Sequence, residues 1–154
     1  MVTIRTLRED DRARIAAAIR SLDRESIYMR LFTYRRSLTE AGLDRVMRAG
    51  PDDLVLVVTV GEGAEEAVVA SGRSVRTSAT SAEVAFMVSQ DYQGKGIARR
   101  LLERFVEAAR ANGLSQLEAD VLGENRAMLA VFERSGLAMR RARDGNVVHV
   151  TLAL

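Results

Sequence analysis

The spacing of apolar residues along the chain predicts both strands and helices. Stretches in which apolar and polar residues alternate, or in which β-branched residues dominate, are typical of strands, and apolar residues three and four apart are typical of helices. By these criteria we expect strands at residues 2–7, 54–60, 67–75, 82–88, 114–121, 137–141 and 147–152. The same criteria predict helices at residues 11–22, 97–112 and 125–135, and two further helices around residues 27–32 and 37–50.

The order of these elements predicts an α/β fold, of the α+β kind, in which helices pack on one mixed sheet. Short turns join most successive strands, which makes those pairs antiparallel. The strands at 82–88 and 114–121 are instead joined by a helix, and such a crossover unit requires them to be parallel. A chain of 154 residues has the size of one ordinary domain, so we expect a single domain over residues 1–154.

Composition narrows the chemistry that this domain can perform. Apolar residues make up 47% of the chain and charged residues 29%, which is typical of a globular protein. The chain has no cysteine, which excludes disulfides, thiolate metal sites and cysteine nucleophiles. A single histidine, His149, gives little support for a Ser-His-Asp triad or a zinc site, so we expect no metal and interpret His149 as structural.

The charged residues do not indicate a nucleic-acid or membrane partner. The net charge is +2, the arginines are scattered without a basic block interleaved with aromatics, and Lys95 is the only lysine. The longest apolar run, Leu54 to Val60, is too short to cross a bilayer. The first residues contain no charged leader followed by an apolar signal region, so we expect a cytoplasmic protein.

Gly94 and Gly96 flank Lys95 between the end of an expected strand and the start of an expected helix. Glycine at such a junction lets backbone N–H groups approach an anion without interference from a Cβ, and the helix dipole favours negative charge there. The pattern predicts a phosphate-binding loop, although a Gly-x-Gly at such a junction also occurs as an ordinary tight turn. The Gly-x4-Gly-Lys-Ser/Thr spacing of a P-loop is missing, which argues against nucleotide hydrolysis.

The segment Gln93-Gly94-Lys95-Gly96-Ile97-Ala98 resembles the coenzyme A signature of the GNAT superfamily of N-acetyltransferases, Gln/Arg-x-x-Gly-x-Gly/Ala, which follows a strand and opens a helix. The stretch from Asn125 to Leu137 is similar to the second motif of that family, with its Asn, its helix and its closing Gly. The resemblance covers nearly the whole chain. It implies a single GNAT-like domain whose central, mostly antiparallel sheet is splayed between the strands at 82–88 and 114–121.

The same resemblance implies a donor and a place for it. Acetyl-CoA would be the acyl donor, with its pyrophosphate on the segment from Gln93 to Ala98 and with Asn125 as a further cofactor-binding residue. The pantetheine arm would pair with the backbone near Phe86, Met87 and Val88. A backbone N–H of the last two would stabilise the oxyanion that forms during acyl transfer.

Glu83 lies inside an otherwise apolar strand, where a bare charge is costly unless it is solvated or paired. An amine must lose a proton before it attacks, so a carboxylate beside it can act as general base, directly or through water. The resemblance supports this role, because related acetyltransferases often place a glutamate on this strand. The competing interpretation is structural, with Glu83 exposed at an edge or paired with Arg73 or Arg76.

The sequence departs from the family pattern at Phe132. Many family members have a tyrosine seven residues after the Asn of the second motif, where it protonates the leaving thiolate, and a phenyl ring has no proton to give. Three alternatives follow: the thiolate leaves unassisted, water donates the proton, or another hydroxyl such as Ser135 or Tyr92 does so. The departure also leaves open a domain that binds acyl-CoA without turning it over.

A narrower resemblance concerns the acceptor. The segment from Ser26 to Phe32, the pair Ala82-Glu83, and Asn125 with Met128-Leu129 look like the catalytic domain of bacterial Pat-type protein lysine acetyltransferases. By this resemblance Tyr28, Arg30 and Phe32 are candidates for the acceptor side, with helix packing as the alternative.

We therefore expect transfer of an acetyl group from acetyl-CoA to a primary amine, in the first place a protein lysine. The alternatives are a small-molecule amine as acceptor, and a non-catalytic acyl-CoA-binding sensor. Homodimers are common in proteins of this resemblance, but the sequence does not decide the oligomeric state.

Overall fold

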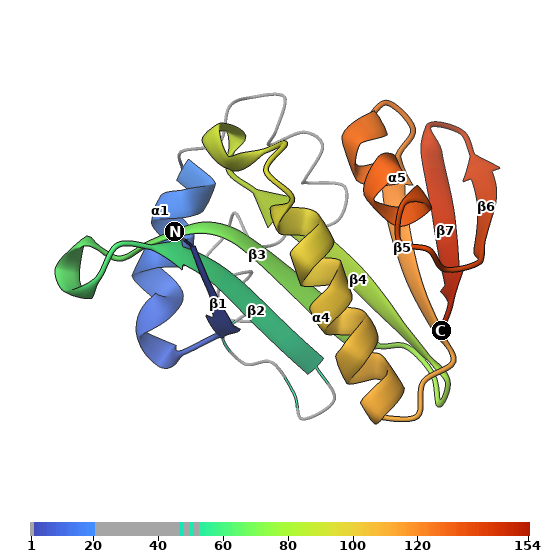
Figure 1. Ribbon diagram of the computed structural model, residues 1–154, viewed down its shortest axis with the longest axis horizontal. Coiled ribbons are helices and arrows are strands. Elements are labelled where there is room, and N and C mark those ends of the chain that lie inside the picture. The colour runs from blue at the N-terminus through green and yellow to red at the C-terminus, as the bar shows by residue number, and fades with distance from the viewer. Residues whose placement is uncertain (1, 21–46, 48–49, 51–52) are drawn as a thin grey trace.

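The computed structural model describes residues 2–20, 47, 50 and 53–154, and within them seven strands form one sheet (Figure 1). The strands are β1 (Thr3–Thr6), β2 (Asp53–Val60), β3 (Ala67–Arg76), β4 (Ser81–Val88), β5 (Gln116–Leu122), β6 (Met139–Asp144) and β7 (Val147–Ala153). The helices are α1 (Arg12–Arg20), α4 (Ile97–Ala111) and α5 (Arg126–Glu133), with 3-10 turns η1 (Glu9–Asp11), η3 (Gly63–Glu65) and η4 (Gln90–Tyr92).

The strands and helices predicted for this part of the chain are present. The largest shift is at β6, which begins at Met139 and runs to Asp144 instead of covering residues 137–141. The helix expected at residues 11–22 is preceded by the turn η1, and its predicted end lies outside the described residues. The helices expected around residues 27–32 and 37–50 also lie outside them, apart from Met47, which is helical.

The strand order is β1-β2-β3-β4-β5-β7-β6, and every neighbouring pair is antiparallel except β4 and β5. This confirms the predicted α/β class and the mostly antiparallel sheet. The parallel pair is short, because its register consists of Ser81↔Gln116, Ala82↔Leu117 and Glu83↔Glu118. Beyond Glu83 the two strands diverge, which is the splay that the sequence led us to expect.

The sheet is covered on both faces, and β2 shows this most clearly. Leu56 and Val58 belong to the larger apolar cluster, which includes side chains from α4 and α5. Val55 and Val57 point to the opposite face, where they pack with Ile15 of α1. The β-branched run in β2 is therefore buried on both sides, as its composition predicts.

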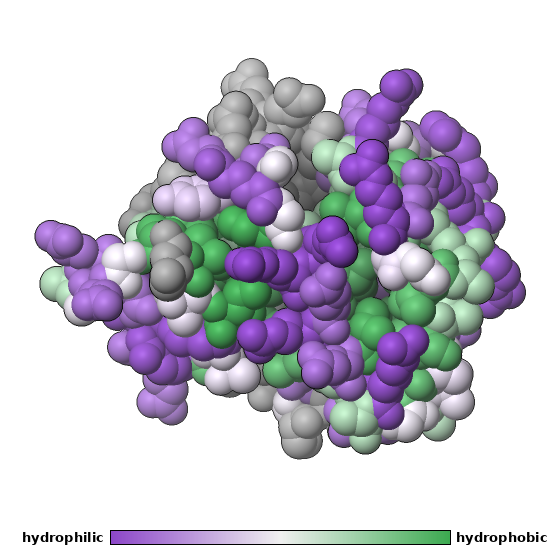
Figure 2. Space-filling view, in the orientation of Figure 1, coloured by the Kyte–Doolittle hydropathy of each residue, from purple (hydrophilic) through white to green (hydrophobic). Residues whose placement is uncertain are grey.

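Helix α4 lies across the sheet with one apolar face inward. Its inward residues are Ile97, Leu101, Leu102, Phe105 and Ala109, with Val106 half-buried at their margin. Figure 2 shows this side of the molecule, where hydrophilic side chains follow the outer surface of α4 and apolar surface lies beside them. None of the described helices is both long enough and apolar enough to span a membrane.

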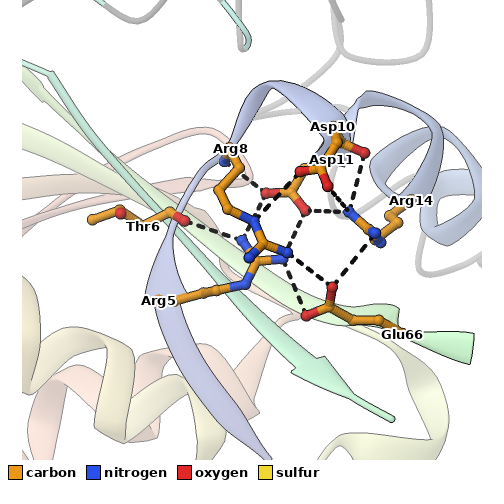
Figure 3. Close-up of polar contacts among 7 residues, drawn as sticks. All are labelled: Arg5, Thr6, Arg8, Asp10, Asp11, Arg14 and Glu66. Atoms are coloured by element: carbon orange, nitrogen blue, oxygen red, sulfur yellow. Dashed lines mark hydrogen bonds and ion pairs between the residues drawn. The ribbon is translucent and has the colours of Figure 1, made fainter. Parts of the chain in front are cut away.

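A buried ion-pair network fixes the start of α1 to the sheet (Figure 3). The fully buried Asp11 accepts two hydrogen bonds of 2.8 Å from the Arg5 guanidinium and one of 2.7 Å from the backbone N–H of Arg8. Burial alone would raise the pKa of Asp11, but these hydrogen bonds lower it to about 2. Glu66, just before β3, accepts from Arg5 at 3.2 Å and from Arg8 at 3.0 Å, so the network joins β1, η1 and β3.

Candidate active site

A cleft opens where β4 and β5 diverge. It has about 420 Å³ of empty space that is open to solvent. Helices α4 and α5 lie over the same face of the sheet, α4 beside β4 and α5 beside β5 (Figure 1). The lining residues are Val84, Ala85, Phe86, Ala119, Asp120, Val121, Leu122, Asn125, Met128 and Phe132.

The three residues that we expected beside the pantetheine arm occupy different environments. Phe86 lines the cleft, and its ring lies 6.0 Å from that of Phe132. Met87 is buried on the opposite face, in the cluster that contains α1. The backbone carbonyl of Val88 accepts a hydrogen bond of 3.2 Å from the Gln93 side chain, which ties the following loop to the end of β4. Phe86 can therefore contact a ligand through its ring, whereas Met87 can do so only through its backbone.

The loop that opens α4 has the conformation required of an anion cradle. Gly94 and Gly96 have φ angles of +74° and +81°. Apart from their immediate neighbours in the chain, no heavy atom lies within 4 Å of the position that a Cβ would take at either residue. Gly96 is the N-cap of α4 and no side chain caps the helix, so its first N–H groups remain available to a ligand. Lys95 is exposed, whereas the Ile97 side chain is in the core and Ala98 is half-buried.

Asn125 begins α5 at the wall of the cleft. Its Oδ1 accepts a hydrogen bond of 3.2 Å from the backbone N–H of Met128, so the carbonyl end serves as a helix cap and the amide nitrogen is the end available to a ligand. Phe132 lies seven residues after Asn125, about two helical turns further on, and is buried. Neither Ser135 nor Tyr92 lines the cleft, and none of the described lining residues carries a hydroxyl group.

Glu83 occupies the last register position before the strands separate, and it is half-buried. Within the described part of the chain its side chain forms no ion pair or hydrogen bond. Arg73 pairs with Asp53 at 3.5 Å, and Arg76 donates to backbone carbonyls of the following turn, so neither arginine fills the structural role that we considered. Glu83 is not among the residues that line the cleft.

The sequence analysis did not identify the charged residues beside Glu83, which are Glu118, Asp120 and His149. His149 of β7 is 2.7 Å from Asp120 through Nδ1 and 3.1 Å from Glu118 through Nε2. The hydrogen bond to Asp120 raises the pKa of His149, and the one to Glu118 adds to it. Burial raises the pKa of Glu83, the charges of Asp120 and Glu118 raise it further, and His149 opposes them.

The alternation of β5 contained a signal for this group. Glu118 and Asp120 interrupt apolar residues at a spacing of two, which puts both carboxylates on one face of the strand. The pairing with His149 required the register of β5 with β7, where Asp120 lies opposite His149. The site thus combines an uncapped helix start that could hold an anion, a largely apolar cleft between two strands, and carboxylates on the far face of the sheet.

Comparison with known proteins agrees with this geometry. The sequence matches the family described as acetyltransferase (GNAT) domain over residues 1–138. The chain belongs to the GNAT acetyltransferase family. The resemblance that the two motifs suggested is thereby confirmed, and so is the enzyme class.

Two curated relatives and one crystal structure illustrate the position of the chain within the GNAT family. It is 37% identical over 127 residues to the acetyltransferase Pat of Mycolicibacterium smegmatis, a match that covers 80% of this chain and 37% of Pat. It is 29% identical to an acetyltransferase of Pseudomonas aeruginosa, covering 96% of this chain and 82% of the relative. The GNAT domain of S. lividans PAT superposes with a TM-score of 0.86 at 29% identity, over 99% of this chain and 90% of that domain.

Proposed function

We propose that this GNAT domain transfers an acetyl group from acetyl-CoA to a primary amine, in the first place the side chain of a protein lysine. The observation that carries the proposal is the divergence of β4 from β5. A largely apolar cleft opens between these strands, and the loop before the uncapped start of α4 is tied to the end of β4. The chain spans little more than a third of the Pat relative, so the substrates and regulation of that whole protein are not assumed.

The donor, acetyl-CoA, would lie along the cleft between β4 and β5. Its pyrophosphate would accept hydrogen bonds from the backbone N–H groups of Gly94 to Ala98, where two glycines have positive φ and no side chain caps the helix. The pantetheine arm would follow the divergent edge of β4 past Phe86, and the amide nitrogen of Asn125 would face it from α5. An extended arm between two separated strands takes the place that a further strand would occupy.

The acceptor would approach from the other face of the sheet. Glu83, Glu118 and Asp120 share that face by register and alternation, and a group of carboxylates favours a protonated amine over a neutral or anionic acceptor. The choice of a protein lysine over a small amine rests on the resemblance to Pat-type lysine acetyltransferases.

The reaction would proceed by direct attack, because the described residues that line the cleft include no serine, threonine, cysteine, lysine, histidine or tyrosine that could form a covalent intermediate. Glu83, through a water molecule, accepts a proton from the ammonium group. The amine nitrogen then forms a bond to the thioester carbonyl carbon, and a backbone N–H at the end of β4 stabilises the oxyanion. The C–S bond breaks and coenzyme A leaves as a thiolate. The nitrogen loses its second proton as it becomes the amide nitrogen, and the thiolate takes up this proton through water, since Phe132 has none to donate.

The substitution Glu83→Gln tests the base. We expect turnover to fall about 100-fold, because general base catalysis is worth that much or more, while acetyl-CoA binding is unchanged. Thiol release measures turnover, and calorimetric titration with acetyl-CoA measures binding. Undiminished turnover of Glu83→Gln across the neutral and alkaline range would remove the role that we assign.

Phe132 favours one alternative function, a sensor that binds acyl-CoA without turnover. Such a protein would be stabilised by acetyl-CoA, because a ligand that binds the folded state alone raises the unfolding temperature. A panel of lysine peptides and small amines, with thiol release as the readout, separates the three candidates. Release with peptides alone supports the lysine acceptor, release with small amines alone supports the second candidate, and stabilisation without any release supports the sensor.

A further inference from the structure

The two ring nitrogens of His149 both face carboxylate oxygens. Nδ1 lies 2.7 Å from Asp120 Oδ1, and Nε2 lies 3.1 Å from Glu118 Oε1. A neutral imidazole has one donor and one acceptor nitrogen, so one of these contacts would bring a lone pair against a carboxylate. Both contacts are favourable only when both nitrogens carry protons. The geometry therefore fits the imidazolium form, held between two acceptors.

This ion-paired group, His149 with Glu118 and Asp120, reaches the candidate active site at two points. Asp120 lines the cleft between β4 and β5, so one of the carboxylates that His149 holds is part of the cleft wall. Glu118 is the register partner of Glu83, which places these two carboxylates side by side on the same face of neighbouring strands. The three side chains of the group are partly exposed, at 40% for His149, 24% for Glu118 and 38% for Asp120.

We propose that His149 is a positioning residue for acetyl transfer: its imidazolium holds Glu118 and Asp120 and thereby keeps Glu83 in the carboxylate form that accepts a proton. The inference rests on the proposed role of Glu83 as general base. Without His149, Glu83 would face two uncompensated negative charges at close range, and a carboxylate beside like charges retains its proton to higher pH. A base that is still protonated cannot accept the proton of the acceptor.

Other charged groups on this face do not replace His149. On β3, Arg73 shares the face of Glu83, because its register partner is Ala85, but it is paired with Asp53. On β6, Arg140 and Asp144 share the face of His149, because Ala142 between them is its register partner, and they carry opposite charges. Among the described residues, His149 is thus the cation in direct contact with the two carboxylates beside Glu83.

The test is a direct titration of Glu83 by NMR in the full chain, with ¹³C in the glutamate side-chain carboxyls. The signal of Glu83 is assigned by its absence in Glu83→Gln. In His149→Gln we expect the titration midpoint of Glu83 to move to higher pH. The acid limb of kcat/KM should move in the same direction, with activity recovered on the alkaline side. Damage to packing alone would lower kcat/KM at every pH and would not be reversed by alkali.

Two further variants fix the sign of the effect. Asp120→Asn and Glu118→Gln each remove one negative neighbour, so the midpoint of Glu83 should move to lower pH in both. They test whether Glu83 responds to the charges that His149 holds, and they do so even if His149→Gln does not fold. Arg110→Gln removes one positive charge from the exposed end of α4, which packs on the opposite face of the sheet, and should leave the midpoint unchanged. An unmoved midpoint in His149→Gln, or an upward shift in the two carboxylate variants, overturns the proposal.

The titration also separates this inference from the proposed function. If Glu83→Gln retains full turnover, Glu83 is not the base, yet the midpoint of Glu83 in His149→Gln still reports whether His149 controls its ionisation. If Glu83→Gln is impaired while the titration midpoint of Glu83 does not change in His149→Gln, Glu83 remains the proposed base and the positioning role of His149 is overturned.

Discussion

At the scale of single residues, the two ends of α4 carry the same backbone constraint for different reasons. Gly96 precedes the helix with φ at +81°, and Gly113 follows it with φ at +76°. No heavy atom lies within 4 Å of the position that a Cβ would take at either residue, so the requirement for glycine is conformational and not steric. At Gly113 this conformation ends the helix, whereas Gly96 precedes the uncapped first N–H groups that we propose bind the anion.

This pair allows a matched prediction. Gly96→Ala and Gly113→Ala should each lower the free energy of unfolding by about 1 kcal/mol, the cost of a left-handed conformation for a residue with a Cβ. Gly96→Ala should in addition weaken acetyl-CoA binding about 5-fold or more, whereas Gly113→Ala should leave it unchanged. Urea denaturation and calorimetric titration measure the two effects. Equal donor affinity in the two variants would argue against a role of the loop in binding.

At the scale of elements, the contact between β3 and α4 depends on a missing side chain. A Cβ on Gly72 would lie 2.6 Å from Cε2 and 2.9 Å from Cζ of Phe105, and 3.3 Å from Cδ1 of Phe86. The rings of Phe86 and Phe105 pack with centroids 5.7 Å apart, and Phe86 also lines the cleft. The absence of a side chain at Gly72 therefore sets how closely α4 approaches the sheet and where one wall of the cleft lies.

We expect Gly72→Ala to lower the free energy of unfolding by about 1–3 kcal/mol, because the aromatic rings must move to admit the methyl group. Since Phe86 is one of them, acetyl-CoA binding should weaken as well. Gly123→Ala is the control, because its Cβ would meet only the flexible end of the exposed Arg143 side chain, at 3.1 Å, and should change stability by less than about 0.5 kcal/mol. Denaturant titration of both variants gives the comparison, and similar losses in the two would contradict this explanation.

At the scale of the whole molecule, the Asp11 network links the first strand, the first helix and the start of β3, so its state affects global stability (Figure 3). The pKa of Asp11 is about 2 in the folded protein, against 3.8 for the free side chain. A lowered pKa stabilises the fold above the unfolded value, and that stability is lost as the pH falls from 3.8 towards 2. The difference corresponds to about 2 kcal/mol.

Asp11→Asn should therefore lower the free energy of unfolding by about 2–3 kcal/mol at neutral pH, because it removes the buried partner of Arg5. The difference in the free energy of unfolding between wild type and Asp11→Asn should become smaller as the pH approaches 2, because the wild-type carboxyl also becomes neutral there. Asp10→Asn is the control: its side chain is 62% exposed, and its loss should cost less than about 1 kcal/mol at any pH. Urea denaturation over a pH series measures this, and a gap that stays constant down to pH 2 would contradict the account.

Local patterns in the sequence were sufficient to predict most of the fold and part of the site. Alternation and helical spacing are local properties, so they located the strands and helices of the described region. A loop that needs glycine at positions 94 and 96 could be predicted from the short Gly-x-Gly motif, and both glycines have positive φ. The partners of charged side chains depend on which strands become neighbours, and that is not local. Arg73 is near Glu83 but pairs with Asp53, and Asp120 meets His149 across the β5–β7 register.

The exposed position of Lys95 has a practical consequence. It is the only lysine of the chain, and it lies in the loop between the two glycines that open α4. An amine-reactive fluorophore can therefore attach, apart from the α-amino group, at a single known point without any engineered cysteine. The wild-type sequence thus supplies its own labelling handle, and the emission of a dye at that point would report directly on whether the loop is occupied.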